Sequence, residues 1–135
     1  MANASLDKNS RPTTTIIVVG PKGEKTLTAI IDTGFDGFLS VPSSELQEVR
    51  LPGHITVTGT AVLADNRSIS VRLCLATIRL DRDEQVGMCI IASPTGDAFV
   101  GMTCLLAFHK RLMVDVTNGH ADLAPSDYIR SEETA

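Results

Sequence analysis

Apolar and polar side chains alternate along most of this chain, whereas apolar residues at helical spacing are confined to short stretches. Alternation with a period of two is typical of strands that have one buried face. Glycine, proline, asparagine and aspartate occupy the breaks between the apolar runs, and these residues favour turns. The pattern therefore predicts an all-β fold class, mostly strands with one or two short helices. The expected strands are 13–19, 26–31, 54–62, 68–80, 85–92, one that starts at Ala98, and a closing hairpin of 111–116 and 120–125.

Two segments show short helical patterns. Ser44 and Gln47 have the spacing of a capping box, which predicts a connecting helix of one or two turns before Pro52. In the segment 98–108 the apolar spacing suits a second short helix from Gly101 onward. Neither helix is long enough to form a layer of its own.

The strongest β signal is a hairpin formed by 54–62 and 68–80 around a polar tip at 64–67. Its returning strand alternates near the tip, where Ser70 and Arg72 separate apolar residues, whereas both faces are apolar toward its end. The tip is therefore expected to project from the domain, and the base to be buried.

Composition narrows the classes of protein. The chain has 135 residues, 43% of them hydrophobic, with 12 basic against 16 acidic side chains and a net charge of −4. This length can bury a core as one domain. Because the basic residues are scattered, we expect no binding to nucleic acid or to membranes. No stretch approaches the ~20 apolar residues that span a bilayer, and the start of the chain lacks a signal-peptide pattern, so a cytoplasmic protein is expected.

The cysteines and histidines are scattered, without a CxxC pair, an HExxH motif or a triad with the serines. This spacing predicts no metal site. We expect Cys74, Cys89 and Cys104 to be reduced thiols that are buried as small apolar residues.

The segment most informative about chemistry is Asp32-Thr33-Gly34, which follows an apolar strand directly. A carboxylate in this place is partly desolvated, which usually indicates pairing, hydrogen bonding or function. Gly34 lets a backbone N–H approach the carboxylate, and Thr33 offers a hydroxyl that can hold the loop. The alternative interpretation is an Asx-turn, in which Asp32 caps its own loop.

In three segments the chain resembles the retropepsin-like aspartic proteases, which are single-domain homodimers, and the resemblance extends over most of 14–124. These segments are the hairpin leading into 30–37, the tip at 64–67 in the family's flap position, and 98–102, which is similar to its apolar-apolar-Gly element. The strand 112–116 resembles that of small bacterial-type members. The resemblance implies a closed retropepsin-like acid-protease β-barrel, with one lobe per chain in a two-fold homodimer.

The resemblance also implies an aspartic endopeptidase that cleaves polypeptide substrates with an activated water and needs neither a metal nor an organic cofactor. Asp32 of each subunit would meet on the two-fold axis and share a proton, with Thr33 and Gly34 supporting the pair. The implied substrate-binding residues are Asp36, Gly37, Leu63, Ala64, Asp65 and Asn66. The alternative is a catalytically silent peptide-binding or dimerisation module that keeps the fold.

Several positions depart from the family's pattern. The tip at 64–67 is polar where viral members carry glycines, so an ordinary solvated turn is an alternative to a substrate-contacting flap. Phe35 replaces a small residue, and either narrows a subsite or packs into the core. Met102 stands where viral members have an arginine that pairs with the aspartate at the Asp36 position. The remaining candidate partners of Asp36 are Arg11, Arg111 and water.

The domain is expected to span 13–125, with flexible segments at 1–12 and 126–135. The segment 20–26 resembles a phosphate-binding loop, but it lacks the glycine directly before the lysine and lies between two predicted strands. A hairpin turn is therefore expected there.

Overall fold

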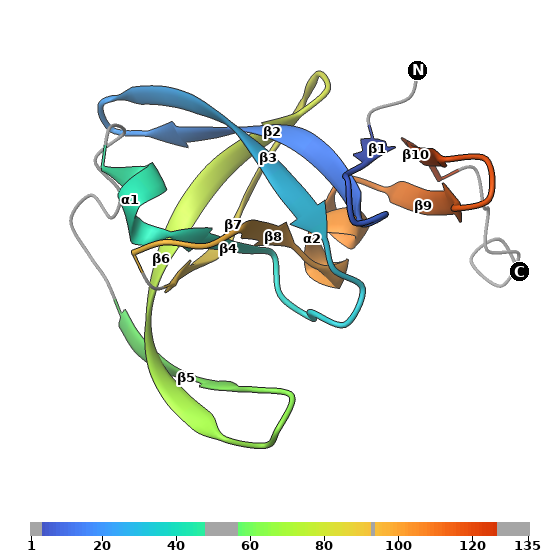
Figure 1. Cartoon of the computed structure of the whole chain (residues 1–135). Coiled ribbons are helices and arrows are strands. Elements are labelled where there is room, and N and C mark those ends of the chain that lie inside the picture. The colour runs from blue at the N-terminus through green and yellow to red at the C-terminus, as the bar shows by residue number, and fades with distance from the viewer. Residues whose placement is uncertain (1–3, 48–56, 93, 127–135) are drawn as a thin grey trace, which may run out of the picture.

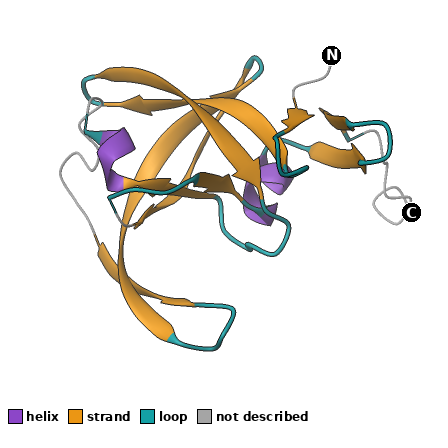
Figure 2. Ribbon diagram, in the orientation of Figure 1, coloured by secondary structure: helices purple, strands orange, loops and turns teal. Residues whose placement is uncertain are grey.

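The computed structural model describes residues 4–47, 57–92 and 94–126 (Figure 1). Strands dominate this part of the chain, and its helices are short (Figure 2). The prediction of an all-β protein is confirmed. In chain order the elements are β1 (Ala4–Leu6), β2 (Pro12–Gly20), β3 (Gly23–Ile31), β4 (Leu39–Pro42), α1 (Ser43–Leu46), β5 (Val57–Val62), β6 (Ser68–Leu80), β7 (Asp83–Ala92), β8 (Ala98–Val100), α2 (Met102–Ala107), β9 (Lys110–Asp115) and β10 (His120–Pro125).

Six of the strands close into a barrel. Neighbours follow the order β2-β3-β8-β4-β7-β6, and β6 pairs back with β2, where Ile78 lies opposite Val18. Strand β1 extends the sheet beyond β2, and β5 extends it beyond β6. Because alternate side chains of a barrel strand point inward, apolar residues such as Ile16, Val18 and Leu39 fill the interior.

Strand β8 comes late in the sequence but lies between two early strands. It pairs in parallel with β3, where Val100 lies opposite Ile31, and antiparallel with β4, where Val100 lies opposite Leu39. Since β8 separates β3 from β4, the chain between these two strands must leave the sheet. It does so as the loop 32–38, which carries the Asp32-Thr33-Gly34 segment.

Strand β5 and the first half of β6 form a hairpin that projects from the barrel (Figure 1). Residues near its tip are exposed, whereas Cys74, Ala76 and Ile78 farther along β6 are buried. The prediction of a projecting tip and a buried base is confirmed. Residues 54–56 of the expected strand lie outside the described residues.

The expected capping box of Ser44 and Gln47 is wrong. Helix α1 begins one residue earlier, at Ser43, and its N-cap residue is Pro42, which is extended (φ −60, ψ 141) and makes no side-chain cap hydrogen bond. Proline has no side-chain oxygen that could cap the helix. Helix α2 begins directly after Gly101, as predicted.

The N-terminal segment, which was expected to be flexible, includes a strand. Strand β1 pairs antiparallel with β2, with Ser5 opposite Thr13. The Asp7 carboxylate closes the connecting turn by accepting hydrogen bonds from the N–H groups of Asn9 (2.8 Å) and Arg11 (2.9 Å). Three residues are too few for alternation to reveal a strand. Of the expected C-terminal tail, 127–135 lie outside the described residues.

Three smaller points complete the fold. Cys74, Cys89 and Cys104 are free and buried, as predicted. The segment 20–26 contains the turn between β2 and β3, in which Gly20 lies opposite Gly23, also as predicted. In the described ranges, no helix combines the length and the apolar character needed for a membrane span.

Candidate active site

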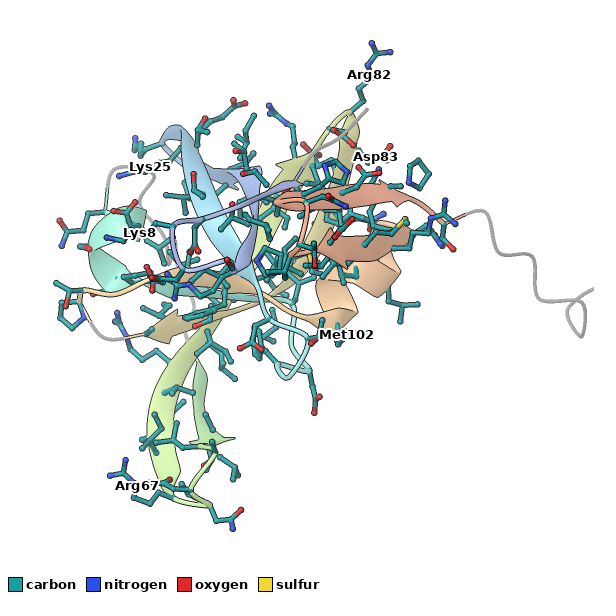
Figure 3. All side chains as sticks on the ribbon, turned by 45° about the vertical axis from the view of Figure 1, so that its right-hand side comes forward. Lys8, Lys25, Arg67, Arg82, Asp83 and Met102 are labelled. Carbon is teal, nitrogen blue, oxygen red and sulfur yellow. The ribbon has the colours of Figure 1, made fainter. Side chains whose placement is uncertain are left out.

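The segment that joins β8 to α2 holds the loop 32–38 in place. The N–H of Asp32 donates to the carbonyl oxygen of Val100 (2.9 Å), and the N–H of Met102 donates to that of Phe35 (2.8 Å). Figure 3 shows Met102 beside this loop, where α2 begins. These bonds join backbone groups, so the position of Asp32 depends on how β8 enters the sheet.

Gly101 allows the backbone after β8 to lie directly against the backbone of the loop 32–38. A Cβ atom at this position would lie 2.3 Å from the carbonyl oxygen of Gly37 and 2.4 Å from that of Phe35. Both distances are far shorter than a van der Waals contact, so a residue without a side chain is needed here. This is the physical reason for the glycine in the apolar-apolar-Gly segment.

Asp36 is anchored through its main chain. Its carbonyl oxygen accepts hydrogen bonds from the N–H of Thr103 (3.2 Å) and from the Thr103 hydroxyl (2.5 Å). The carboxylate is exposed and forms no ion pair with another described residue. Arg11, one of its expected partners, instead pairs with Asp7 (2.8 Å) and Asp97 (3.6 Å). Among the described residues, Thr103 and not a charged side chain therefore fixes this part of the loop.

The Asp32 side chain is half-buried, and one of its two carboxylate oxygens has a hydrogen-bond partner among the described residues. Its Oδ1 atom accepts a hydrogen bond from the N–H of Gly34 (2.9 Å), and its carbonyl oxygen accepts one from the N–H of Phe35 (3.1 Å). Within the described part of the chain, Oδ2 has no hydrogen-bond partner. An Asx-turn and an active-site carboxylate both contain the bond to Gly34, so this bond alone does not distinguish the two interpretations.

A cleft of about 400 Å³ lies beside Asp32. Thr33 lines it together with Leu112 and Val114 of β9, and its other lining residues are Arg11, Pro12, Ile30, Ile31 and Phe99. The sequence analysis did not assign Leu112 and Val114 to the site, because β9 is distant in the chain and its apolar pattern indicates only a strand. Among the described side chains, no three of His, Cys, Asp and Glu gather in a way that could hold a metal ion.

A second hollow, of about 810 Å³, lies along the projecting hairpin. Leu63 lines this groove, as do apolar residues of β5, β6 and β7, among them Val62, Ile69 and Ile90. The exposed fractions of Val62 (67%) and Ile69 (42%) are high for large apolar side chains. Exposed apolar surface that lines a hollow is typical of a binding site.

Phe35 also lines the groove, while its ring packs on the loop. Added Cβ atoms at Gly37 and Gly101 would lie 2.6 and 2.7 Å from the nearest ring atoms. The ring therefore lies directly against both glycines. Phe35 thus packs on its own loop and forms a wall of the groove; it is half-buried and does not belong to the core, and a role in a subsite stays a prediction.

The hairpin tip stays apart from Asp32. Arg67 pairs with Asp65 (2.6 Å) at the tip, where Asn66 has a positive φ of 68°. Figure 3 shows Arg67 at the far end of the hairpin. Ala64, Asp65 and Asn66 are exposed and line neither the cleft nor the groove. The single chain therefore brings Thr33 and Gly34 to Asp32, but not the predicted tip residues.

Comparison with known proteins identifies the fold. No protein-family model and no curated protein matches the chain. Among solved structures, the EIAV protease complexed with the inhibitor HBY-793 matches with a TM-score of 0.64, over 82% of this chain and 99% of that chain. The fold is retropepsin-like. The expected closed retropepsin-like barrel is thus confirmed. The sequence identity is 16%, so the likeness establishes the fold alone, and membership of a bacterial-type group stays a prediction.

Proposed function

We propose that the chain is an aspartic endopeptidase whose active unit is a homodimer, with Asp32 of each subunit forming the catalytic pair. The observation that carries this proposal is the state of Asp32 within a retropepsin-like fold. Its loop is held by β8 and α2, Gly34 orients Oδ1, and Oδ2 is left without a described partner beside a cleft. An Asx-turn alone requires neither the cleft nor the backbone bonds to β8 and α2.

Two carboxylates are required because the reaction needs a proton acceptor and a proton donor at the same time. Two carboxyl groups in contact on the two-fold axis of the dimer would share one proton, because two negative charges side by side repel each other. The ionised carboxylate takes a proton from water as the water oxygen attacks the scissile carbonyl carbon, and the protonated carboxylate donates to the carbonyl oxygen. A proton then passes to the leaving amide nitrogen. The N–H of Gly34 would hold the carboxylate in the required orientation.

Features of the single chain support a second copy at this place. The Thr33 side chain is exposed and has no hydrogen bond with another described residue. Val114, which lines the cleft, is 44% exposed, and the nearby Met113 and Val116 are 53% and 58% exposed. Exposed large apolar residues that follow each other along one strand are typical of an element that a partner covers. A two-fold partner would bury them and bring the second Asp32.

The proposed substrate is an extended polypeptide that lies along the groove. Its apolar walls favour apolar side chains. Asp36 and Gly37 of the loop and residues 63–66 of the hairpin are proposed to hold the substrate backbone. Since the tip stays apart from Asp32 in the single chain, the hairpin must close over the substrate before residues 64–66 can act.

The proposal is tested by the Asp32→Asn variant. Asparagine keeps the size of the side chain but can neither accept the water proton nor share one. We expect kcat/KM on a peptide library to fall by at least roughly 10²- to 10⁴-fold, because general acid-base catalysis is lost. Asp83→Asn, an exposed acid-to-amide change at the first residue of β7, is the matched control and should cleave normally. Cleavage by Asp32→Asn at the wild-type rate would refute the proposal.

The alternative function, a silent peptide-binding module, is favoured by one observation, the polar hairpin tip that stays apart from Asp32. This alternative predicts peptide binding without cleavage in both the wild type and Asp32→Asn. A pH-rate profile separates the two functions. Catalysis by carboxylates that share one proton weakens both when the pair is fully protonated and when it is fully ionised, which gives a bell-shaped profile.

A further inference from the structure

Cys74 and Cys89 lie directly opposite each other on the neighbouring antiparallel strands β6 and β7. Residues in such a pair point to the same face of the sheet, with Cα atoms about 4.5–5.5 Å apart. A disulfide needs a Cα separation of about 4.4–6.8 Å. The backbone therefore already has the spacing of a cross-strand disulfide, although both cysteines are free.

The two thiols also influence each other. The Cys89 thiol donates a hydrogen bond to the carbonyl oxygen of Ile90 (3.7 Å), and it lies close enough to the Cys74 thiol for each to shift the pKa of the other. The hydrogen bond from Cys89 lowers the pKa of Cys74, with a smaller contribution from the charge of Arg72, whereas the same bond and burial raise the pKa of Cys89. Cys74 is thus the cysteine of the pair that forms a thiolate more readily.

Cys104 provides a contrast within the same chain. It is fully buried on α2, and burial raises the pKa of its thiol to about 12. A thiol of this kind is inert, because the thiolate is the reactive form. Cys74 retains 5% exposure, whereas Cys89 and Cys104 retain none. A small oxidant therefore reaches Cys74 before the other two.

The pair lies where the projecting hairpin joins the barrel. Cys74 directly follows Leu73, the residue of β6 opposite the first residue of β5. On the other side, Cys89 lies opposite Leu39 of β4. Figure 3 shows Arg67 and Arg82, which flank β6, at opposite ends of the molecule, so β6 continues from the hairpin into the barrel. A bond between the two sulfurs would tie the base of the hairpin to the barrel wall.

We propose that Cys74 and Cys89 form a redox-active dithiol, which hydrogen peroxide converts into an intrachain disulfide. The Cys74 thiolate attacks one peroxide oxygen and the O–O bond breaks, so that Cys74 becomes a sulfenic acid and the other oxygen leaves as water after taking a proton. The Cys89 sulfur then attacks the sulfenic sulfur, and the hydroxyl leaves as water with the Cys89 proton. Overall, two thiols are oxidised to one disulfide, and one peroxide is reduced to two waters.

The test treats the native chain with hydrogen peroxide, unfolds it in denaturant, alkylates the remaining thiols and analyses the chain by mass spectrometry. The number of thiols that can be alkylated should fall from three to one per chain, and the mass before alkylation should fall by two hydrogen atoms. Trypsin cleaves after Arg72, Arg79, Arg82 and Lys110, so the Cys74 peptide 73–79 separates from 83–110. Since 83–110 contains both Cys89 and Cys104, the digest is repeated on Cys104→Ala. The cross-linked peptide pair should persist in that variant and return to free peptides after reduction.

Each result decides the matter. Linkage of 73–79 to 83–110 in both the wild type and Cys104→Ala, with Cys89 left as a free thiol in Cys74→Ala, supports the proposal. Retention of all three thiols in the wild type would overturn it. So would oxidation of Cys74 to a sulfinic acid without linkage, or a disulfide between two chains. If a cysteine variant fails to fold, fragmentation of the linked wild-type peptides between Cys89 and Cys104 assigns the bonded cysteine, and no step depends on peptidase activity.

Discussion

The Asp32 carboxylate owes its orientation to its near neighbour and its location to distant ones. Gly34 donates to Oδ1 across two residues, a contact that the local sequence is sufficient to form. The backbone bond to Val100 comes from the other half of the chain. The sequence analysis could therefore name Asp32, Thr33 and Gly34 from their types and order. It could not identify Val114 as a wall of the same cleft, because that contact depends on folding.

Asp7 gives a residue-scale prediction about pH. Chiefly the backbone N–H of Arg11, with the N–H of Asn9 and the Arg11 side chain, lowers the pKa of the Asp7 carboxyl below its usual value of 3.8. A carboxyl whose pKa is lower in the folded chain stabilises the fold above the unfolded pKa, and this stabilisation is lost as the pH falls through the folded pKa. Asp7→Asn should therefore unfold at lower urea concentration than the wild type at neutral pH.

The difference between the two urea midpoints should shrink as the pH falls below 3.8, because the wild-type carboxyl then becomes neutral as well. Asp83→Asn serves as the control for replacing an exposed carboxyl by an amide outside this turn. A midpoint difference for Asp7→Asn that stays constant at low pH would show that the turn depends on the shape of the side chain and not on its charge.

At the scale of elements, β8 organises the site. It was predicted as a strand followed by a short helix, which is what the structure shows. Its place between β3 and β4 was not predictable, because three residues carry too little pattern to specify their neighbours. Strand β4 was missed for the same reason, since Leu39–Pro42 has four residues, three of them buried, and no alternation.

Gly101→Ala tests this element. Alanine tolerates the backbone dihedral angles at this position (φ −113, ψ −170), so the cost arises from contact with the carbonyl oxygens of Phe35 and Gly37. We expect a loss of roughly 1–3 kcal/mol in the free energy of unfolding, as for other overpacked sites. Amide hydrogen exchange should also become faster at Asp32 and Met102, because their N–H hydrogen bonds form only when the backbone at Gly101 lies against the loop 32–38.

Gly96→Ala is the matched control for that experiment. A Cβ atom at Gly96 meets nothing within 4 Å, and the backbone there has a positive φ of 127°. This change should cost stability through local backbone strain alone and leave exchange at Asp32 unchanged. Equally faster amide exchange at Asp32 in both variants would mean that the contact between Gly101 and the loop 32–38 does not hold this loop in place.

At the scale of the whole molecule, the strand β9, which lines the cleft beside Asp32 through Leu112 and Val114, also carries exposed apolar side chains. Met113 and Val116 are more than half exposed, and Val114 lines the cleft. Helix α2, which packs against β9, adds Leu106 with 74% exposure. A monomer gains nothing from this arrangement, whereas a two-fold dimer would bury it and complete the proposed site.

The double variant Met113→Asp/Val116→Asp should therefore be monomeric and inactive. Burying an apolar side chain of this size contributes roughly 1.5–3 kcal/mol, so losing two should weaken the dimer by more than roughly 100-fold. Sedimentation analysis at several protein concentrations measures the effect, and peptide cleavage is followed in the same samples.

Val86→Asp is the matched control. Val86 is a similarly exposed apolar residue (61%). It lies on β7 opposite Thr77 of β6, and so belongs to neither β9 nor α2, the elements of the proposed interface. This variant should remain dimeric and active. A double variant that stays dimeric and cleaves peptides would place the interface on another face of the molecule.

The sequence by itself determined the class of fold, the strands long enough to alternate, and the Asp-Thr-Gly segment at the end of a buried strand. Each of these depends on neighbours within a few residues, where the spacing of apolar side chains and the conformational demands of glycine act directly. Only the tertiary structure decided that β8 enters between β3 and β4, that β9 faces Asp32 across a cleft, and that Cys74 and Cys89 lie opposite each other. These relations depend on barrel closure and strand register, which arise from packing between segments far apart in the chain.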